Sequence, residues 1–299
     1  MGYVQAASPD SLEALAGLVD GFSGHISYIA GGTDFIVALE HGSQAGLIVD
    51  ISNIGELNFI EPGPKSVRIG AATPLSALLD RNELTAKLPA LTQAAIQVGS
   101  VQIRNRATIG GNIASAVPGG DLLPVLKCLD CRIEVLRRDK TVTSHAFDEV
   151  VTGLGKTSLG NGDVIKSITI PLQFGKNRVS AFGKIGRRRE LTIARLNLAA
   201  LADYEATDNR INDIRIVAGA IGPVPLRLQS VEQKLRGRKI DQACVDDFLL
   251  ALVDAVDEAI PGRNSHRYKR HAVLGLGLDL MESLFGKTFS YSEQSQQPA

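Results

Sequence analysis

Apolar residues near the start of the chain follow a helical spacing and then form shorter runs. Four of them recur every three or four residues, as on one face of a helix: Leu12, Leu15, Ala16 and Val19. Ser8 and Pro9 predict where this helix begins, because Ser favours the N-cap and Pro the first helical position. Three segments then predict a compact βαβ-like unit: a strand at Ile26–Ala30, a helix at Phe35–Leu39 and a strand at Leu47–Ile51.

The middle of the chain alternates between short strand and helix patterns. Apolar and β-branched runs predict strands at Val67–Gly70, Arg132–Leu136, Thr141–Ser144 and Val164–Pro171. Apolar residues at helical spacing predict helices at Leu75–Leu79, Leu88–Val98 and Asp121–Leu129. The glycine-rich stretch between the last two helices predicts a loop.

After the polar segment Gln173–Arg178, the pattern changes to longer strands followed by helices. A strand is predicted at Ser180–Ile185, and a hairpin pairs Leu196–Tyr204 with Ile211–Gly219. Helices are predicted at Ser230–Leu235, Asp241–Ala259 and His266–Phe285. This order indicates a second domain with a small antiparallel sheet and three helices.

Length and charge narrow the class of protein. The chain has 299 residues, enough for two or three domains, and 44% of them are hydrophobic, enough for a sizeable core. Its 32 basic and 32 acidic residues balance, so we expect neither nucleic acid nor a membrane surface as a partner. Residues 1–6 lack a basic region followed by an apolar core, so we expect no signal peptide and a cytoplasmic location.

Two glycine pairs carry the clearest chemical signal. Gly110 and Gly111 lie between Thr108 and Asn112, and the carboxylate of Asp121 follows. Paired glycines let backbone N–H groups approach an anion, Thr and Asn add donors, and Asp accepts from sugar hydroxyls. This combination suits a nucleotide or a flavin dinucleotide.

A second pair, Gly31 and Gly32, follows the predicted strand Ile26–Ala30, and Thr33 and Asp34 are expected to begin a helix. A strand, a glycine turn and a helix N-terminus together favour anion binding. For either pair alone, an ordinary structural turn explains the glycines equally well.

Together the two stretches resemble the FAD-binding subunit of the molybdenum hydroxylases, the family of xanthine, carbon monoxide and nicotinate dehydrogenases. The resemblance rests on Ala30–Asp34, Gln102–Asn105, Thr108–Asn112 and Asp121–Pro124, in that order and spacing, and it covers nearly the whole chain. The segment Ala116–Gly120 departs from the residues common in the family, but we still expect a loop there.

The resemblance implies an α+β fold in which a two-lobed α/β FAD-binding domain of the PCMH type precedes a smaller domain. The first would cover residues 1–175, with lobes of about 1–55 and 56–175. A domain like the C-terminal domain of the CO dehydrogenase flavoprotein would cover 178–286, and residues 287–299 would form a flexible tail.

The resemblance also implies which residues hold FAD, with the pyrophosphate on the two glycine turns. The motif Phe182–Ala194 resembles the family's entry into the second domain, where the lysine, here Lys184, lies beside the flavin. A cation there would stabilise the reduced ring; without the resemblance Lys184 reads as a surface lysine. The implied cofactor-binding residues are Ile29, Ala30, Gly31, Gly32, Thr33, Asp34, Phe35, Thr108, Ile109, Gly110, Gly111, Asn112, Asp121, Ile165 and Lys184.

Other candidate chemistry is weaker. The run Arg187–Arg189 fits a nicotinamide nucleotide, but a solvated face or a partner contact is the favoured interpretation. Cys128 and Cys131 form a C-x-x-C pair with no second ligand pair, so we expect packing residues and no metal site. We find no arrangement of acids, bases or nucleophiles, and therefore predict no catalytic residue in this chain.

The function implied by the resemblance is electron transfer. A large subunit with molybdopterin would hydroxylate a substrate, a small subunit with [2Fe–2S] centres would relay electrons, and FAD in this chain would pass them to NAD⁺ or another acceptor. The three subunits would assemble as a dimer of heterotrimers. The alternatives are a stand-alone flavin reductase of the same fold, such as an enolpyruvyl-sugar reductase, and a non-catalytic FAD scaffold.

Overall fold

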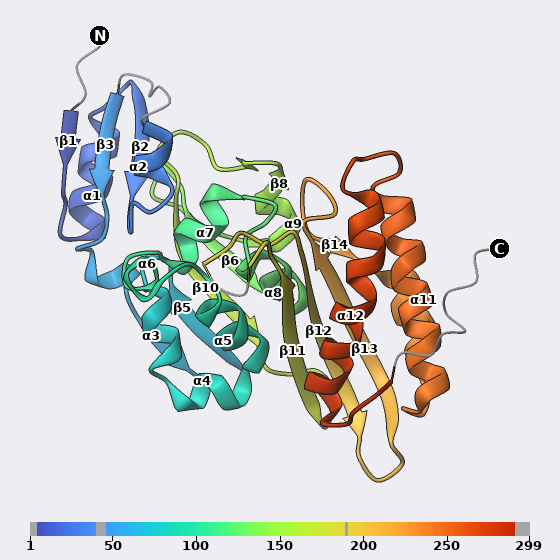
Figure 1. Cartoon of the computed structure of the whole chain (residues 1–299). Coiled ribbons are helices and arrows are strands. Elements are labelled where there is room, and N and C mark those ends of the chain that lie inside the picture. Colours follow the sequence, from blue (N-terminus) through green and yellow to red (C-terminus); the bar gives the residue numbers. More distant parts are fainter. Residues whose placement is uncertain (1–4, 40–45, 189–190, 291–299) are drawn as a thin grey trace. The chain divides into compact units, whose positions relative to one another are not determined.

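The computed structural model describes residues 5–39, 46–188 and 191–290, which fold into two compact units (Figure 1). Each unit is assembled from separate stretches of chain. The first comprises Met1–Arg81, Gly99–Val117 and Asp130–Leu172, and the second Asn82–Val98, Pro118–Leu129 and Gln173–Ala299. The predicted α+β class is confirmed. The domains expected from the sequence are continuous stretches of chain, whereas the two units combine separate stretches that pack together. The expected domain boundaries therefore stay a prediction.

A small parallel sheet begins the first unit. Its strands, in the order β1-β3-β2, are β1 (Gln5–Ala7), β3 (Gly46–Asp50) and β2 (His25–Ile29). Helix α2 (Phe35–Leu39) joins β2 to β3, which confirms the expected βαβ-like unit. Helix α1 (Leu12–Asp20) contributes Leu15 and Val19 to the core beneath this sheet.

The predicted start of α1 is wrong by one turn. Ser11, not Ser8, is the N-cap, and its Oγ accepts a hydrogen bond from the Ala14 N–H at 3.2 Å. Ser11 lies immediately before Leu12, the first residue of the apolar pattern. Ser8 instead accepts from the Asn53 side chain at 3.4 Å. Ser8 fitted the N-cap pattern locally because Pro9 follows it, but the cap that forms is the serine next to the first helical residue.

The second sheet of this unit has five antiparallel strands in the order β4-β5-β10-β6-β7. They are β4 (Ile60–Pro62), β5 (Ser66–Gly70), β10 (Val164–Pro171), β6 (Arg132–Leu136) and β7 (Val142–Ala146). Of these five strands, β10 comes last in the sequence, and it lies at the centre of the sheet. Its residues Ser167, Ile168 and Ile170 are fully or almost fully buried.

Short elements complete the first unit. They are the 3-10 helix Gly55–Leu57, α3 (Leu75–Leu79), α6 (Val101–Arg104), α7 (Ile109–Ser115), α9 (Phe147–Val150), β8 (Val151–Gly153) and β9 (Lys156–Thr157). The stretch between residues 102 and 121, for which a loop was predicted, therefore contains helix α7. The prediction failed because Gly110 and Gly111 are typical of turns.

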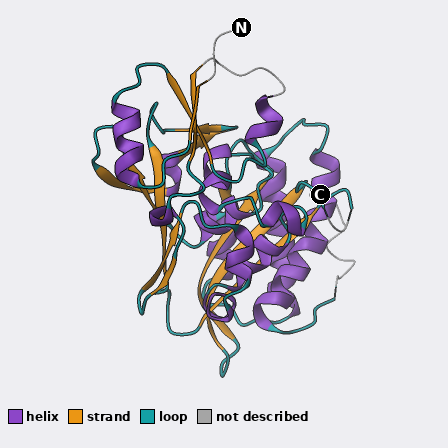
Figure 2. Cartoon of the chain, turned by 90° about the vertical axis from the view of Figure 1, so that its left-hand side faces the viewer, coloured by secondary structure: helices purple, strands orange, loops and turns teal. Residues whose placement is uncertain are grey.

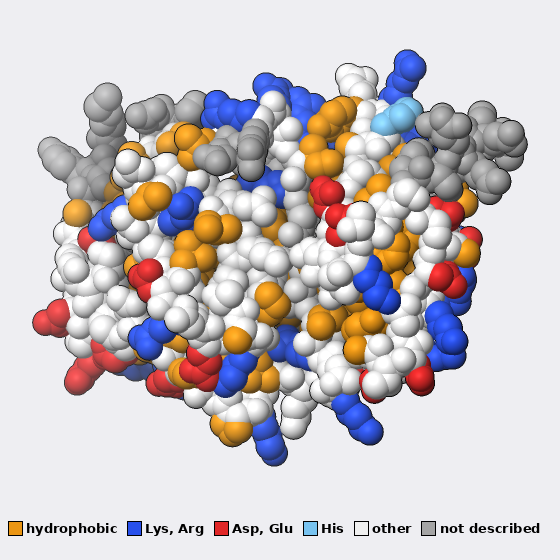
Figure 3. Space-filling model, turned by 60° about the horizontal axis from the view of Figure 1, so that its bottom comes forward, with side chains coloured by type: hydrophobic (Ala, Val, Ile, Leu, Met, Phe, Trp, Pro, Cys, Tyr) orange, Lys and Arg blue, Asp and Glu red, His pale blue; other side chains and the backbone are white. Residues whose placement is uncertain are grey.

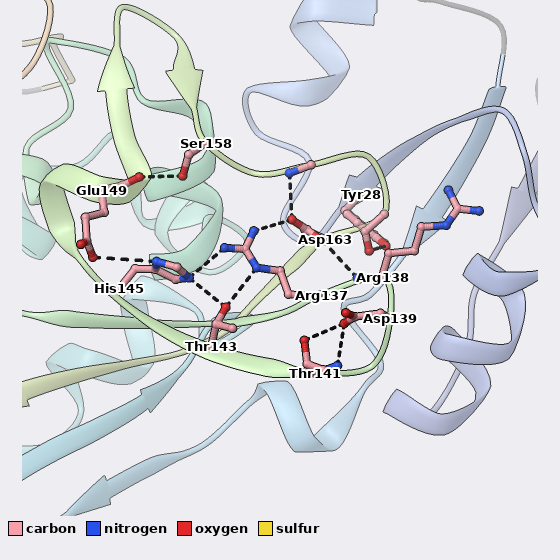
Figure 4. A network of polar contacts seen from close by, with 12 residues as sticks. Tyr28, Arg137, Arg138, Asp139, Thr141, Thr143, His145, Glu149, Ser158 and Asp163 are labelled. Atoms are coloured by element: carbon pink, nitrogen blue, oxygen red, sulfur yellow. Dashed lines mark hydrogen bonds and ion pairs between the residues drawn. The ribbon is translucent and has the colours of Figure 1, made fainter.

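A polar network anchors β6 and β7 to the loop before β10 (Figure 4). Arg137 donates from Nη1 to Asp163 at 2.6 Å, from Nε to Thr143 at 3.0 Å and from Nη2 to His145 at 2.8 Å. Asp163 also accepts from the backbone N–H groups of Arg138 and Gly160. Because an arginine cannot accept a hydrogen bond, Nε2 of His145 is the acceptor in this arrangement.

The second unit is built on one antiparallel sheet, ordered β11-β12-β13-β14. Its strands are β11 (Arg178–Ile185), β12 (Leu196–Glu205), β13 (Arg210–Gly219) and β14 (Leu226–Arg227). The predicted hairpin of β12 and β13 is confirmed. Figures 1 and 2 show helices along these long strands.

Helices cover both faces of this sheet. The unit contains α4 (Asn82–Lys87), α5 (Pro89–Ile96), α8 (Leu122–Cys128), α10 (Gln229–Leu235), α11 (Gln242–Ala259) and α12 (His266–Phe285). Alternate residues of β12, such as Leu198 and Ala200, share a core with the last three helices. The other face packs against α5 and α8. The first eight residues of β12 are consequently all buried.

The surface has no dominant charge on the face drawn in Figure 3, where Lys and Arg side chains are interspersed with Asp and Glu. This distribution agrees with the formal net charge of zero. Among the described helices, none combines the length and apolar character needed to cross a bilayer.

Candidate functional site

The first glycine pair follows β2, and each of its two positions requires glycine for a different reason. A Cβ atom on Gly31 would stand 1.9 Å from the carbonyl oxygen of Arg106, so only glycine permits this close approach of two backbones. Gly32 has a φ of +75°, in the left-handed region that favours glycine. Thr33 and Asp34 form a turn before α2, which begins at Phe35 rather than at Thr33.

The second glycine pair lies in the first turn of α7 rather than in a free turn. Thr108 is the N-cap, and its Oγ1 accepts from the Gly111 N–H at 3.0 Å. A Cβ on Gly110 would stand 2.5 Å from the Cβ of Ala71, so packing requires this glycine. Gly111 is exposed, and a Cβ there would meet only Thr108 Oγ1, at 2.9 Å. The expected tight turn is therefore wrong, because a capping threonine turns the sequence into a helix.

The structure brings the two pairs together within the first unit. Gly31 touches the backbone of Arg106 and Ala107, directly before the Thr108 cap. Ala107 in turn accepts from the Leu75 N–H at 2.9 Å, and Thr108 forms an isolated bridge with Pro74. Two stretches some seventy-five residues apart in the sequence thus form one local surface, as the shared motif required.

The residues around this surface fit a bound dinucleotide, which carries hydroxyl donors as well as phosphates. Asn112 has a buried side-chain Oδ1 that accepts no hydrogen bond within the described part of the chain. Buried polar atoms without a partner are uncommon and call for a ligand or a water. The exposed backbone at Gly111 is the second sign of fit. Ile29, Ala30 and Thr33 are half-buried next to the first glycine pair, while Asp34 is exposed.

Three further predicted residues lie on neighbouring elements of this unit. Ile109 is completely buried at the start of α7 and packs in the core. Ile165 is 4% exposed and pairs with Val135 on β6, where the register shifts between Ile165 and Ser167. Phe35 opens α2 and is half-buried. The role of these three residues in cofactor binding stays a prediction.

The remaining two predicted residues meet each other in the second unit. Lys184, on β11, donates from Nζ to Asp121 Oδ2 at 2.5 Å and to the carbonyl oxygen of Gln97 at 3.0 Å. Their side chains are only 5% and 6% exposed. Lys184 is therefore no surface lysine, and its charge has a partner. An ammonium has three donors, and these two bonds use two of them.

Burial dominates the electrostatics of this pair. It raises the pKa of Asp121 to about 6, although Lys184 and the amide of Asn197 both favour the charged form. The Asn197 Nδ2 donates to Asp121 Oδ1 at 3.4 Å. The pair is thus a carboxylate and an ammonium held out of water, with Asp121 close to taking up a proton near neutral pH.

Reasoning from the sequence missed Asn197 and the Gln97 carbonyl. Asn197 is 0% exposed in a strand whose neighbours are leucine and alanine. A single amide in an otherwise apolar strand was the only sequence feature that pointed to Asn197. Its partner, Asp121, lies 76 positions away in the sequence.

The arginine run after β11 lines an open hollow. Arg187 and Arg188 lie beside a hollow of about 650 Å³ that also includes Arg195 and the exposed Ile193. Arg189 lies outside the described residues. The solvated face or partner contact favoured from the sequence, and the alternative nucleotide contact, stay predictions.

The cysteines pack in the interior. Cys128, Cys131 and Cys244 are all buried and free. Burial raises the pKa of the Cys128 thiol to about 12 and that of Cys244 to about 11. Within residues 5–39, 46–188 and 191–290, no group of three or more His, Cys, Asp or Glu side chains is placed to hold a metal ion.

The fold is that of a chain found in CO dehydrogenases. The structure matches a chain of the reconstituted CO dehydrogenase from Oligotropha carboxidovorans with a TM-score of 0.85. The match covers 96% of this chain and 99% of that one, at 22% identity. At this identity the likeness establishes the fold alone.

Sequence comparison supplies the family. A family model described as the FAD binding domain in molybdopterin dehydrogenase matches residues 2–173, and the CO dehydrogenase flavoprotein C-terminal domain matches residues 181–284. The chain therefore belongs to the FAD-binding subunits of the molybdenum hydroxylase family and carries an FAD-binding domain.

Two curated relatives illustrate the range of the family. The glyceraldehyde dehydrogenase medium chain of Sulfolobus acidocaldarius is 28% identical over 247 residues, covering 82% of this chain and 85% of its own length. The xanthine dehydrogenase FAD-binding subunit of Escherichia coli O157:H7 is 28% identical over 249 residues, covering 82% and 84%. These two relatives are named for different substrates at equal similarity to this chain.

Proposed function

We propose that this chain is the electron-transfer subunit of a molybdopterin-dependent hydroxylase, with FAD as its only cofactor. The observation that carries the proposal is the pair of family models, which match residues 2–173 and 181–284 and so cover nearly the whole chain. Gly31 of the first pair contacts the backbone directly before the Thr108 cap of the second, which supports their assignment to the same ligand. FAD, when bound, supplies the redox chemistry.

In this proposal the chain's residues bind and orient the cofactor. The segments Ile29–Phe35 and Thr108–Asn112 would hold the pyrophosphate at the exposed Gly111, with the unpartnered Asn112 Oδ1 accepting from a hydroxyl of the same ligand. Ile165 would contact the cofactor from β10. Asp121 and Lys184 would lie at the isoalloxazine, where a buried ion pair sets the charge that the ring experiences.

The partners belong to the same proposal. A large subunit would carry molybdopterin and hydroxylate the substrate, a small subunit would carry [2Fe–2S] centres, and two such heterotrimers would form the complete enzyme. Electrons would leave the flavin to NAD⁺ or another acceptor. The names of the relatives, which are medium chains or FAD-binding subunits, support this division of labour. The cytoplasmic location expected from the sequence stays a prediction.

Purification of the full chain tests the proposal directly. We expect one FAD per chain by absorption, no molybdenum or iron by elemental analysis, and electron transfer from NADH to an artificial dye. Hydroxylation of purines, aldehydes and N-heterocycles should appear only after both partner subunits are added. Substrate turnover by the lone chain would instead favour a self-sufficient flavoenzyme. Bound FAD that neither NADH nor reduced partner subunits can reduce would identify a scaffold.

A further inference from the structure

A buried amide supports the ion pair of the second unit. Asn197 lies on β12, and its Nδ2 donates to Asp121 Oδ1 while Lys184 Nζ donates to Asp121 Oδ2. The carboxylate is therefore held from both oxygens by side chains of two adjacent strands, which pair at Lys184 and Asn197. We propose that Asn197 is a positioning residue for the flavin: its amide orients the Asp121 carboxylate onto the Lys184 ammonium and so fixes where that charge sits.

The surroundings of Asn197 are poorly explained by stability alone. Its Oδ1 is buried and accepts no hydrogen bond from any described residue, which an apolar side chain in the same strand would avoid. The opposite residue on β13 is Gly219, and a Cβ there would stand 2.1 Å from Asn197 Oδ1. The next residue, Ala220, has a φ of +61°. An unsatisfied acceptor, a glycine within a strand and a left-handed alanine gathered at one point are typical of functional sites.

The position of Ala220 is held by further contacts within the same unit. Its N–H donates to the Pro118 carbonyl at 3.0 Å, and its own carbonyl accepts from Lys269. Pro118 belongs to the segment that leads to Asp121. The loop after β13 is therefore tied on one side to the Asp121 segment, and the strand before it leaves room for the Asn197 amide.

The protonation of Asp121 gives this arrangement a measurable consequence. The side chains that act on Asp121 come from β11, as Lys184, and from β12, as Asn197, and both favour the charged form against burial. Loss of the Asn197 donor must therefore raise the proton affinity of Asp121. At neutral pH more of the carboxyl would be neutral, and the Lys184 charge would lose its compensation.

This inference rests on the proposed function, because the flavin must lie at Lys184 for the potential to respond. The first variant is Asn197→Ser in the full FAD-loaded chain, with the flavin midpoint potential measured from pH 5 to pH 8. In the native protein we expect the plot of midpoint potential against pH to show a step near pH 6, where Asp121 changes its protonation state. In Asn197→Ser the step should move upward by up to about one pH unit, a tenfold change in proton affinity. The double variant Asn197→Ser/Asp121→Asn should show no step.

Ser180→Ala provides the matched control. Ser180 is also a buried polar residue of the same sheet, 5% exposed, and its Oγ accepts from the Ala90 N–H at 3.3 Å, away from Asp121. Its loss should leave the step where it is. A second variant, Gly219→Ala, keeps the amide but must displace it, and should also move the step. An unmoved step in both Asn197→Ser and Gly219→Ala overturns the positioning role.

A second measurement separates this inference from the proposed function. The Asp121 carboxyl can be titrated by carbon NMR in the FAD-free chain, where Asn197→Ser should raise its midpoint and Ser180→Ala should not. A raised midpoint without any FAD binding would reject the flavin assignment and leave a purely structural amide, which also overturns the inference. A raised midpoint together with a moved potential step supports both.

Discussion

Gly31 lies against Arg106 so closely that an added Cβ would stand 1.9 Å from the Arg106 carbonyl oxygen. The neighbouring atoms are backbone and cannot rotate away. We therefore predict that Gly31→Ala lowers the free energy of unfolding by about 1–3 kcal/mol or more, as over-packing does. Gly111→Ala is the control, because it meets a single hydroxyl, and it should change stability by much less. Denaturant unfolding of the FAD-free chain compares the two; equal losses would contradict the assignment.

Gly111 is the sharper probe of the cofactor. Gly111→Val should leave the fold intact while weakening FAD binding by roughly tenfold to a hundredfold, because the side chain enters space proposed for the phosphate. Gly32→Val cannot serve in the same way, since its φ of +75° would strain any valine and disturb the turn itself. Fluorescence titration with FAD measures the affinity. Normal affinity in a folded Gly111→Val protein would remove α7 from the proposed site.

Replacing Asp121 and replacing Lys184 should shift the reduction potential of the flavin in opposite directions. Asp121→Asn leaves the Lys184 charge uncompensated and should raise the potential by roughly 30–60 mV, where 30 mV is about 1.4 kcal/mol for two electrons. Lys184→Met should lower it, and by less, because an unpaired Asp121 would take up a proton. Spectroscopic redox titration at pH 8 gives the order. A Lys184→Met potential above that of Asp121→Asn would rule out a flavin near this pair.

Asp121 also predicts a pH dependence of stability without FAD. Its pKa is about 6 in the folded chain against an ordinary value of 3.8, so the folded state binds the proton more tightly. The stability that this provides is fully present below about pH 4 and is lost as the pH rises through 6. Relative to Asp121→Asn, the native protein should lose about 3 kcal/mol over this range. Asp208→Asn, at an exposed carboxylate, should run parallel to the native protein; the same behaviour in Asp121→Asn would contradict the shift.

The Arg137–Asp163 ion pair in the network of Figure 4 should stabilise the chain more than the exposed Lys140–Asp20 ion pair does. Arg137→Met should destabilise the chain by about 1–3 kcal/mol, because Asp163 is 9% exposed and His145 and Thr143 also lose a donor. Lys140→Met breaks an exposed pair with Asp20, which water screens, and should change stability much less than Arg137→Met. Thermal unfolding of both variants measures the difference, and equal shifts would show that the network is no stronger than a surface contact.

Local signals predicted most elements, and the misses have physical causes. The eight-residue run of β10 and the long helices α11 and α12 stand out from their neighbours, and their predicted limits agree with the structure within one residue. Helix α7 was taken for a loop because two glycines outweighed the Thr108 cap. Helix α4 was missed because only Leu84 of its six residues is buried.

The candidate site was harder to predict than the fold. Its motifs named the residues but not their contacts, since Lys184 and Asp121 lie 63 positions apart and meet only through tertiary packing. Likewise, nothing local to Gly31 indicates that its neighbour is the backbone of Arg106. Contacts of this kind depend on the path of the whole chain, which periodicity does not encode.

The interleaving of the two units sets an order for events during synthesis. Residues 82–98 and 118–129 leave the ribosome well before β11–β13, the sheet that their apolar helices α5 and α8 cover. The five-stranded sheet likewise waits for its central strand β10, which ends only at Pro171. A nascent chain released at residue 172 would expose the buried faces of α5 and α8, which makes premature termination products a target for chaperones and proteases.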